Sequence, residues 1–425
     1  MLRLTELRLP LAHAEAALRE ALVRRLGISD RDLHSFTIFR RGYDARKRSA
    51  IQLVYTIDCE LSDEAQVLAR LGGDAHLRRA PDTSYHFVAR ARVDGSRPST
   101  APGGRPLVIG FGPCGLFAAL LLAQMGLNPI VLERGKRVRE RTLDTWGLWR
   151  RGVLDPESNV QFGEGGAGTF SDGKLWSQVS DPRHLARKVL TEFIKAGAPE
   201  EIAFVAKPHI GTFRLVGVVE KMRAEIESLG GEVHFQQRVT DLHIEQGHVR
   251  GVTTADGTEW RSDHVVLALG HSARDTFAML HARGVAMLAK PFSVGFRIEH
   301  PQSLIDRARF GPSAGHPLLG AADYKLVHHA GNGRSVYSFC MCPGGTVVAA
   351  TSEAGHVVTN GICIILRWHS TNSAKESGLL SSQRMRWASM KALKIPPLQR
   401  FERGWRSGAD RVNDKTRKPS LASGF

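Results

Sequence analysis

The feature that most constrains this 425-residue chain is a glycine-rich turn between two apolar segments. The sequence reads LVIGFGPCG at residues 107–115 and continues as an apolar stretch of helical composition as far as Gly126. A second apolar run, IVLE, then ends at Glu133. Strand, Gly-x-Gly-x-x-Gly turn, helix and a second strand that ends in a carboxylate form the fingerprint of a domain that binds the ADP half of a dinucleotide. The sequence therefore predicts an α/β domain of the Rossmann type, with an ordinary glycine-rich turn as the alternative.

Each part of this fingerprint has a physical role. Gly110 permits the tight turn, Gly112 lets the backbone approach a pyrophosphate at the helix start, and Gly115 brings the helix against the strand. Glu133 can accept hydrogen bonds from ribose hydroxyls and would repel a 2′-phosphate, so FAD and NAD both fit. The cofactor-binding residues predicted in this region are Gly110, Gly112, Pro113, Cys114, Gly115, Glu133 and Arg134.

The second half of the domain favours FAD over NAD. The chain shows a strand at residues 232–235, then Val239 and alternating segments broken by two turns, and finally an apolar strand at 263–269 that ends at Gly270. A third strand, a small antiparallel meander and a closing strand resemble the pattern of glutathione-reductase-type FAD domains. The gap of about a hundred residues after Glu133 also fits, because such flavoproteins insert flavin-contacting loops there. Val239 and Gly270 are therefore added to the predicted cofactor site.

Four motifs carry a resemblance to one family between residues 105 and 361. They are VIGFGPCGLF at 108–117, GEGGAGTFSDGKL at 163–175, KPHIGT at 207–212 and SFCMCPGGTV at 338–347. With these motifs the chain resembles the bacterial FAD-dependent dehydrogenases of the glutathione-reductase superfamily that carry an extra N-terminal domain. The resemblance stops near Gly361. It implies an FAD-dependent oxidoreductase that passes a hydride through the flavin, with NAD(P)H as a candidate electron donor and a small-molecule substrate that the resemblance does not identify.

The glycine-rich segment 163–175 is expected near the flavin, because glycines let the backbone run close to a ring or a phosphate. The predicted contacts are Gly165, Gly166, Ser171 and Lys174, and Lys174 is the candidate cation beside the anionic reduced ring.

The sequence assigns no catalytic residue. His209 and His271 lie beside motifs and are either proton donors or structural histidines. Cys340 and Cys342 are either a redox-active pair or small buried residues, and they have no companion pair that would suggest a zinc site.

Composition and periodicity divide the chain into five parts. They are an N-terminal α+β domain at 1–91, a linker rich in Gly, Pro and Ser at 92–105, the FAD-binding domain at 106–276, an inserted substrate domain at 277–361, and a basic tail at 362–425. In the first part, strands at 2–9, 36–39, 51–57 and 85–89 and helices at 12–26 and 63–71 give the βαββαβ order of a ferredoxin-like domain.

The net charge of +16 is unevenly distributed. The last 64 residues hold thirteen Lys or Arg against four acids and so supply +9 of it. This tail lacks the glycine-containing flavin segment with which the superfamily ends, which suggests an altered terminus. A genuine divergent basic tail and a helical subdomain are the alternatives, and an altered terminus would fit an inactive product. Basic residues also gather at Arg40–Arg48, which could bind RNA, as in a flavoprotein of RNA modification, or form a solvated hairpin.

The expected compartment is the cytosol. Five cysteines are too few for a disulfide scaffold, and the opening residues alternate and carry charge, unlike a signal peptide. No window reaches the ~18 consecutive apolar residues of a membrane span.

Overall fold

The computed structural model describes residues 1–89, 104–171, 173–175, 179–290, 293–338, 341–356 and 358–363. All of them belong to one compact unit, Met1–Ile365. The basic tail beyond residue 363 and the expected linker, apart from its last two residues, lie outside the described residues, as do Asp172 and Cys340.

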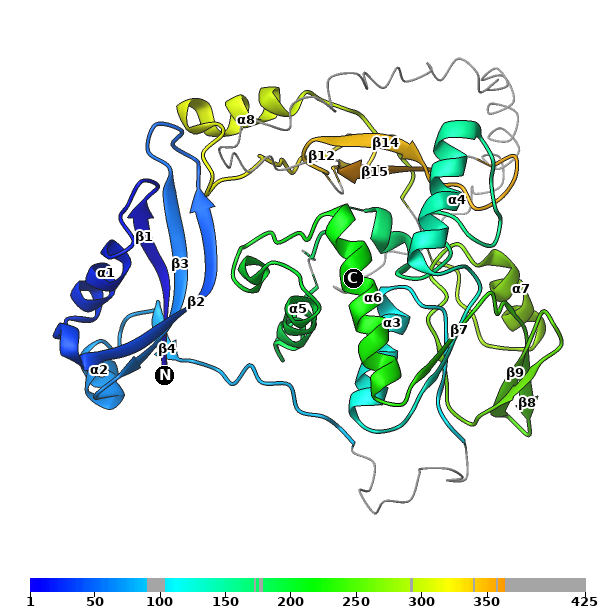
Figure 1. The fold of residues 1–425 in the computed structure, drawn as a ribbon. Helices are drawn as coiled ribbons and strands as arrows, with labels where there is room; N and C mark the ends of the chain where they lie inside the picture. Colours follow the sequence, from blue (N-terminus) through cyan, green and yellow to red (C-terminus); the bar gives the residue numbers. More distant parts are fainter. Residues whose placement is uncertain are drawn as a thin grey trace, which may run out of the picture. The chain divides into compact units, whose positions relative to one another are not determined.

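The N-terminal region forms a four-stranded antiparallel sheet with two helices. Its elements are β1 (Leu2–Pro10), α1 (Ala17–Leu26), β2 (Leu33–Asp44), β3 (Gln52–Leu61), α2 (Glu64–Arg70) and β4 (Leu77–Arg79). The strand order is β2-β3-β1-β4, and every neighbouring pair is antiparallel. Helices α1 and α2 lie along one side of this sheet (Figure 1). Alternate residues of β3, such as Leu53, Ile57 and Leu61, are buried in one core with Leu22 of α1 and Val67 of α2.

The last strand of this sheet is not where the sequence predicted it. Residues 85–89 alternate like a strand but have no regular secondary structure, and the rings of Tyr85 and Phe87 instead pack edge to face with centroids 5.1 Å apart. The short segment Leu77–Arg79 pairs with β1 because Leu77 faces Leu4 and is buried in the core. Burial of one leucine outweighs a longer alternating pattern here.

The central region contains the predicted parallel sheet. Its strands are β5 (Leu107–Ile109), β6 (Ile130–Glu133), β7 (Glu232–Phe235) and β11 (Val265–Leu267), in the order β11-β5-β6-β7. All three neighbouring pairs are parallel. The fold is therefore mixed α/β with a parallel sheet. The glycine-rich turn joins β5 to α3, and β6 follows, as expected.

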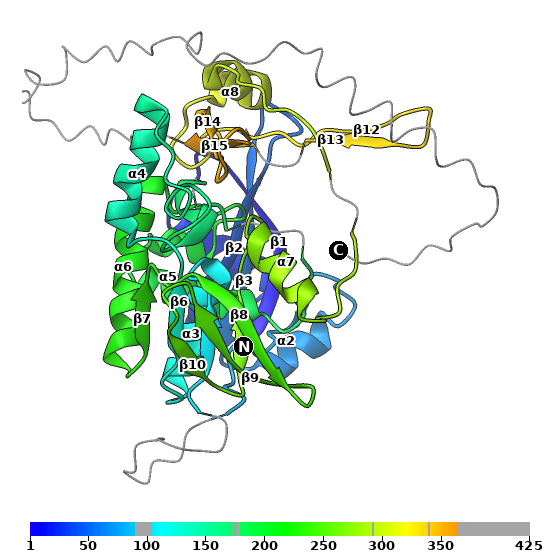
Figure 2. The same cartoon turned by 90° about the vertical axis from the view of Figure 1, so that its right-hand side faces the viewer.

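Two layers cover this sheet. One core joins Val108 and Val131 to helices α3 (Pro113–Gln124) and α6 (Thr212–Ser228). A second core joins Leu107, Ile109 and Leu132 to the other layer. That layer is the antiparallel meander β8 (Val239–Glu245), β9 (His248–Thr254) and β10 (Glu259–Arg261) together with α7 (Arg274–Ala282) (Figure 2). The boundary expected between residues 276 and 277 falls inside α7.

The long connection between β6 and β7 carries α4 (Val138–Arg151), α5 (Leu185–Lys195) and two 3-10 turns, Gly166–Phe170 and Glu200–Ala203. It also meets the N-terminal sheet. The Arg41 amide donates to the Phe204 carbonyl at 2.7 Å, and the Ala206 amide donates to the Arg41 carbonyl at 2.9 Å. The guanidinium of Arg187 donates to the Phe39 carbonyl and stacks over the Phe39 ring.

Residues beyond α7 form one helix and two hairpins among the described residues. They are α8 (Gln302–Phe310), β12 (Val327–His329) with β13 (Ser335–Tyr337), and β14 (Gly345–Ala349) with β15 (Thr359–Cys363). Phe310 of α8 is fully buried in the N-terminal core, where its ring packs edge to face against Tyr43. Trp149 of α4 donates its indole N–H to the Ala349 carbonyl at 2.7 Å.

Candidate cofactor site

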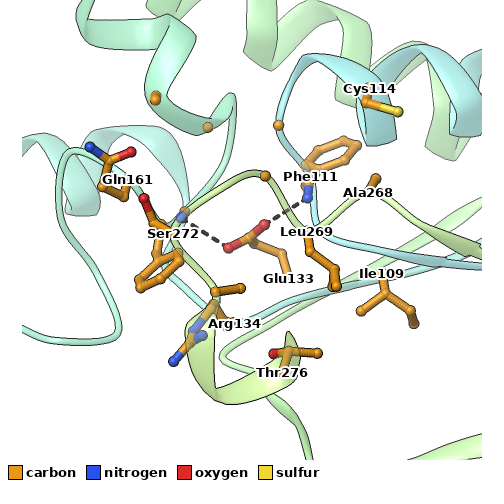
Figure 3. Close-up of a pocket in the computed structure, with 18 of the residues that line it drawn as sticks. Ile109, Phe111, Cys114, Glu133, Arg134, Gln161, Ala268, Leu269, Ser272 and Thr276 are labelled. Carbon is orange, nitrogen blue, oxygen red and sulfur yellow. Dashed lines mark hydrogen bonds between the residues drawn. The ribbon is translucent and has the colours of Figure 1, made fainter. Parts of the chain in front are cut away.

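A cavity of about 310 Å³ lies where the carboxyl ends of β5, β6 and β11 meet (Figure 3). Crevices at the carboxyl ends of parallel strands are where α/β folds bind ligands. The lining comes from five segments: Ile109–Cys114, Leu132–Arg134, Gln161–Gly168, Gln237–Val239 and Ala268–Thr276. Nine residues assigned from the sequence are among the lining residues: Gly110, Gly112, Pro113, Cys114, Glu133, Arg134, Gly166, Val239 and Gly270.

The three glycines of the turn differ in the contacts that a Cβ would make at each position. Gly110 has a positive φ of 97°, and a Cβ there would lie 2.5 Å from the Ala268 carbonyl oxygen. A Cβ on Gly115 would lie 1.9 Å from the Gly110 carbonyl oxygen, so Gly115 acts behind the cavity, where α3 packs on β5. A Cβ on Gly112 would meet only the Cα of Gly166, at an ordinary 3.5 Å. Packing therefore requires Gly110 and Gly115 but not Gly112.

Gly112 is the residue that caps the start of α3, and no side chain among the described residues caps this helix end. Pro113 follows at the first helical position. The first amides of a helix have no acceptor within the helix, and the helix dipole adds partial positive charge at this end. The start of α3 therefore offers donors for an anionic group in the cavity that Gly112 and Cys114 line.

Glu133 is a buried carboxylate held by backbone amides. Its Oε2 accepts from the Phe111 amide at 2.7 Å (Figure 3). Its Oε1 accepts from the amides of Gly135 and Gly163, both at 2.9 Å. An ionised carboxylate has roughly four acceptor sites. Glu133 thus ties the glycine-rich turn to the glycine-rich segment and still has capacity for a further donor.

The glycine-rich segment is organised by a buried arginine that the sequence did not single out. Arg141 of α4 is fully buried. Its guanidinium donates to the carbonyls of Asn159, Val160, Gly163, Glu164 and Gly166 at 2.7 to 3.3 Å. Burial lowers the pKa of Arg141 to about 10, so the side chain stays charged at neutral pH. One side chain therefore fixes the backbone of the segment that forms a wall of the cavity.

Several predicted residues lie beside the cavity rather than in its lining. The Gly165 amide donates to the Phe111 carbonyl at 2.8 Å, which holds the two loops together. The Ser171 hydroxyl donates to the Gly168 carbonyl. Lys174 pairs through its backbone with His209, and its Nζ lies 3.3 Å from the Cys342 Sγ. His271 does line the cavity, whereas His209 does not. The pairing proposed for Cys342 involves Cys340, which lies outside the described residues.

The sequence also missed several lining residues. One of these unpredicted lining residues is Arg238, which lies just before β8. Phe111, Gln161, Phe162, Gln237, Ser272 and Thr276 also line it. Only proximity to the predicted motifs could have suggested them.

The basic hairpin Arg40–Arg48 is partly occupied by contacts within the protein. Arg46 forms an ion pair with Asp44, which Arg8 also contacts. Arg41 lies over the Phe204 ring, 5.1 Å from its centroid, and pairs with Val205 through its backbone. These contacts within the protein support a structural role for the hairpin more than an RNA-binding role.

The described ranges contain neither a candidate metal site nor a candidate membrane-spanning helix. They contain no group of three or more His, Cys, Asp or Glu side chains placed to hold a metal ion. No helix in the described part of the chain combines the length and apolar character needed to cross a bilayer.

Two models of FAD-dependent protein families match parts of this chain. Residues 205–324 match the FAD dependent oxidoreductase family, and residues 291–400 match the family described as FAD-dependent protein, C-terminal domain-like. The chain carries an FAD-dependent oxidoreductase domain. FAD is therefore the cofactor of this domain, as the sequence predicted. The second match continues to residue 400, beyond Gly361, where the resemblance was expected to stop, and residues 1–60 match a domain of unknown function.

One relative is similar to most of this chain. An uncharacterized protein of Clostridium beijerinckii is 42% identical over 363 residues, which cover 85% of this chain. The match spans 66% of that relative's length, so this chain corresponds to about two thirds of it.

Solved structures are more distant. Fructosamine oxidase (Amadoriase II) from Aspergillus fumigatus is 19% identical with a TM-score of 0.29, over 41% of this chain and 49% of that one. Glycine oxidase from Bacillus cereus is 15% identical with a TM-score of 0.28, over 43% and 60%. The GidA-related protein from Thermus thermophilus is 19% identical with a TM-score of 0.24, over 40% and 54%. TM-scores this low carry no argument about this chain.

Proposed function

We propose that this protein is an oxidoreductase that binds the ADP half of FAD in the cavity beside the β5–α3 turn and passes a hydride through the flavin. The observation that carries the proposal is the uncapped start of α3, which opens into this cavity next to the buried Glu133. Anion donors and a ribose acceptor in this arrangement are what the ADP half requires. The FAD-dependent family match adds the cofactor's identity.

The residues present fit that ligand. Gly112 lies at the start of α3 and lines the cavity, and its lack of a side chain would leave room for a pyrophosphate beside the α3 amides. Glu133 keeps acceptor capacity for a ribose hydroxyl after binding three amides. Pro113, Cys114, Arg134, Gly166, Val239 and Gly270 would complete the walls, while Gly110, Gly115 and Gly165 hold the turn from behind.

The flavin would supply a two-electron acceptor that takes a hydride from a small-molecule substrate or from NAD(P)H. Of this chain's groups, Lys174 is the cation proposed to stabilise the reduced ring, and Ser171 lies close to it in the sequence. His209 and His271 stay the two candidate proton donors, and of these His271 lines the cavity.

The wider architecture proposed for this function is that of the glutathione-reductase superfamily. In it, residues 106–276 bind FAD, 277–361 are an inserted substrate domain, and 92–105 are a linker. The N-terminal residues 1–91 form a ferredoxin-like domain, which the βαββαβ order and the strand order β2-β3-β1-β4 support.

The direct test is the spectrum of the purified full chain. We expect a yellow protein with about one FAD per chain, identified as FAD rather than FMN after heat release, and bleached by NADH or NADPH without oxygen if either is the donor. A colourless protein that takes up no added FAD would overturn the proposal and would instead fit the inactive, altered product suggested by the sequence.

Removal of the Glu133 charge should weaken FAD binding. Glu133→Gln replaces one acceptor oxygen with an amide donor that faces backbone N–H groups, so both the ribose contact and the loop contact are lost. We expect the Kd for FAD to rise roughly 10- to 100-fold, the range for a hydrogen bond to a charged group. The control is Glu259→Gln, at an exposed glutamate outside the cavity. Equal Kd values in the two variants would mean that Glu133 does not face the ribose.

A further inference from the structure

Four charged side chains form a network at one end of the cavity. The Arg134 guanidinium binds Glu157 through two N–H···O contacts of 2.9 and 3.1 Å and binds Asp275 through two more of 2.9 and 3.1 Å. Arg238 contacts the same two carboxylates, with Nη1 3.4 Å from Asp275 and Nε 3.6 Å from Glu157. These four residues are called the Arg134 network below.

The network joins segments that are far apart in the sequence. Arg134 directly follows β6, Glu157 precedes the glycine-rich segment, Arg238 precedes β8, and Asp275 lies in the first turn of α7. Each of these segments contributes lining residues to the cavity. Four of its five walls are therefore held to one another by a single cluster of ion pairs, and the fifth wall, the glycine-rich turn, is tied in by Glu133.

The Arg134 side chain is the most buried member of the network. It is 14% exposed, and its guanidinium lies 4.0 Å above the centroid of the Phe162 ring, which also lines the cavity. Burial raises the pKa of Asp275, but the hydrogen bonds from Arg134 outweigh that effect and leave its pKa below the ordinary value. Asp275 is thus charged at neutral pH and holds α7 to the end of β6.

Charge balance separates this network from a phosphate site. Two guanidinium groups face two carboxylates, and Arg134 makes bidentate contact with both acids, so the protein itself neutralises the cations. Arg134 and Arg238 therefore have less attraction left for a ligand phosphate than two unpaired arginines would have. Their geometry suits holding walls together.

We propose that the Arg134 network is a clasp that closes the adenosine end of the cavity and sets the rate at which FAD leaves. This inference rests on the proposed function. Arg134 adjoins Glu133, which places the network beside the ribose, and the ligand can leave at this end only if α7, the loop at Glu157 and the chain before β8 separate. In this proposal FAD leaves through that separation, which breaks the ion pairs. The four residues act by positioning the walls.

The test is the release of FAD from the full holoprotein into an excess of activated charcoal, measured as the flavin absorbance that stays with the protein over time. Asp275→Asn removes one carboxylate charge without touching the lining, and we expect about tenfold faster release, a value discounted for the partial exposure of Asp275. The matched control is Glu353→Gln, which breaks the Arg274–Glu353 pair next door at similar exposure and should release FAD at the parent rate.

The effect of salt on the rate of FAD release distinguishes this role from a purely structural one. Screening by molar NaCl should speed FAD release from the parent and from Glu353→Gln, and should have a much smaller effect on Asp275→Asn, in which the network is already open. If Asp275→Asn does not fold, Glu157→Gln takes its place, because Glu157 is the other carboxylate of the network. Release at the parent rate or slower in the folded variant overturns the clasp.

Failure of the clasp and failure of the proposed function give different results. A parent protein that binds FAD, with unchanged release from the variant, overturns the clasp alone. A parent protein that binds no FAD overturns both.

Discussion

Replacement of Arg141 by methionine should lower the free energy of unfolding by about 3 to 5 kcal/mol and abolish FAD retention. The guanidinium is fully buried and satisfies the carbonyls of five residues in the segment between Asn159 and Gly166. Methionine fills similar space but donates no hydrogen bond, so these buried carbonyls would lose their partner. Urea unfolding of the apoprotein and flavin content after dialysis measure the two effects.

Two further variants make this result specific. Arg141→Lys keeps the charge but loses the planar fork of donors, so we expect an intermediate loss. Arg150→Met lies on the same helix, at an exposed position over Trp146, and should leave both stability and FAD content near the parent values. If Arg141→Met and Arg150→Met behaved alike, Arg141 would not be the residue that orders the glycine-rich segment.

A pair of alanine variants should separate the packing role from the ligand role of the glycine-rich turn. Gly115→Ala would place a methyl group 1.9 Å from the Gly110 carbonyl oxygen, a backbone atom that cannot move aside as a flexible side chain would. We expect about 3 kcal/mol or more of destabilisation, because α3 must move away from β5. FAD binding should be lost together with the fold of the turn, as measured by unfolding midpoint and FAD titration.

Gly112→Ala should behave differently. Its methyl group meets only Gly166, at an ordinary contact distance, so we expect stability within about 0.5 kcal/mol of the parent. The same methyl group occupies the space in front of the α3 amides, so the Kd for FAD should rise at least about tenfold, the cost of losing one charge-assisted hydrogen bond. Parent-like FAD affinity in Gly112→Ala would remove the start of α3 from the proposed site.

The local motifs were predictable because their physics is local. Gly110, Gly115 and Glu133 lie within one βαβ unit, so spacing alone gives the turn, the helix contact and the carboxylate at the end of β6. The same is true of β1, β2 and β3 in the N-terminal sheet. The last strand of the N-terminal sheet was predicted at the wrong residues. The sequence alternates at 85–89, but it does not show that Leu77 is the residue buried beside Leu4.

The contacts that organise the walls could not be predicted from the sequence, because they depend on long-range pairing. Arg134 and Asp275 are 141 residues apart, and the sequence has no signal for the fold that brings them together. Arg141 was missed for a different reason. A charged residue in a helix with several other charges is normally expected on the solvent side, yet Arg141 is among the buried residues of α4.

The pairing of Arg41 with residues 204–206 affects how the protein can be shortened. A chain that started at residue 104 would leave the Phe204 carbonyl and the Ala206 amide without the backbone partner that Arg41 provides. Arg187 would also lose its contact with the Phe39 ring, and Phe310 would lose the core that buries it. We therefore expect a fragment trimmed to the dinucleotide fingerprint to expose unpaired backbone groups and an aromatic side chain, and to be less stable than a version that keeps the first 89 residues.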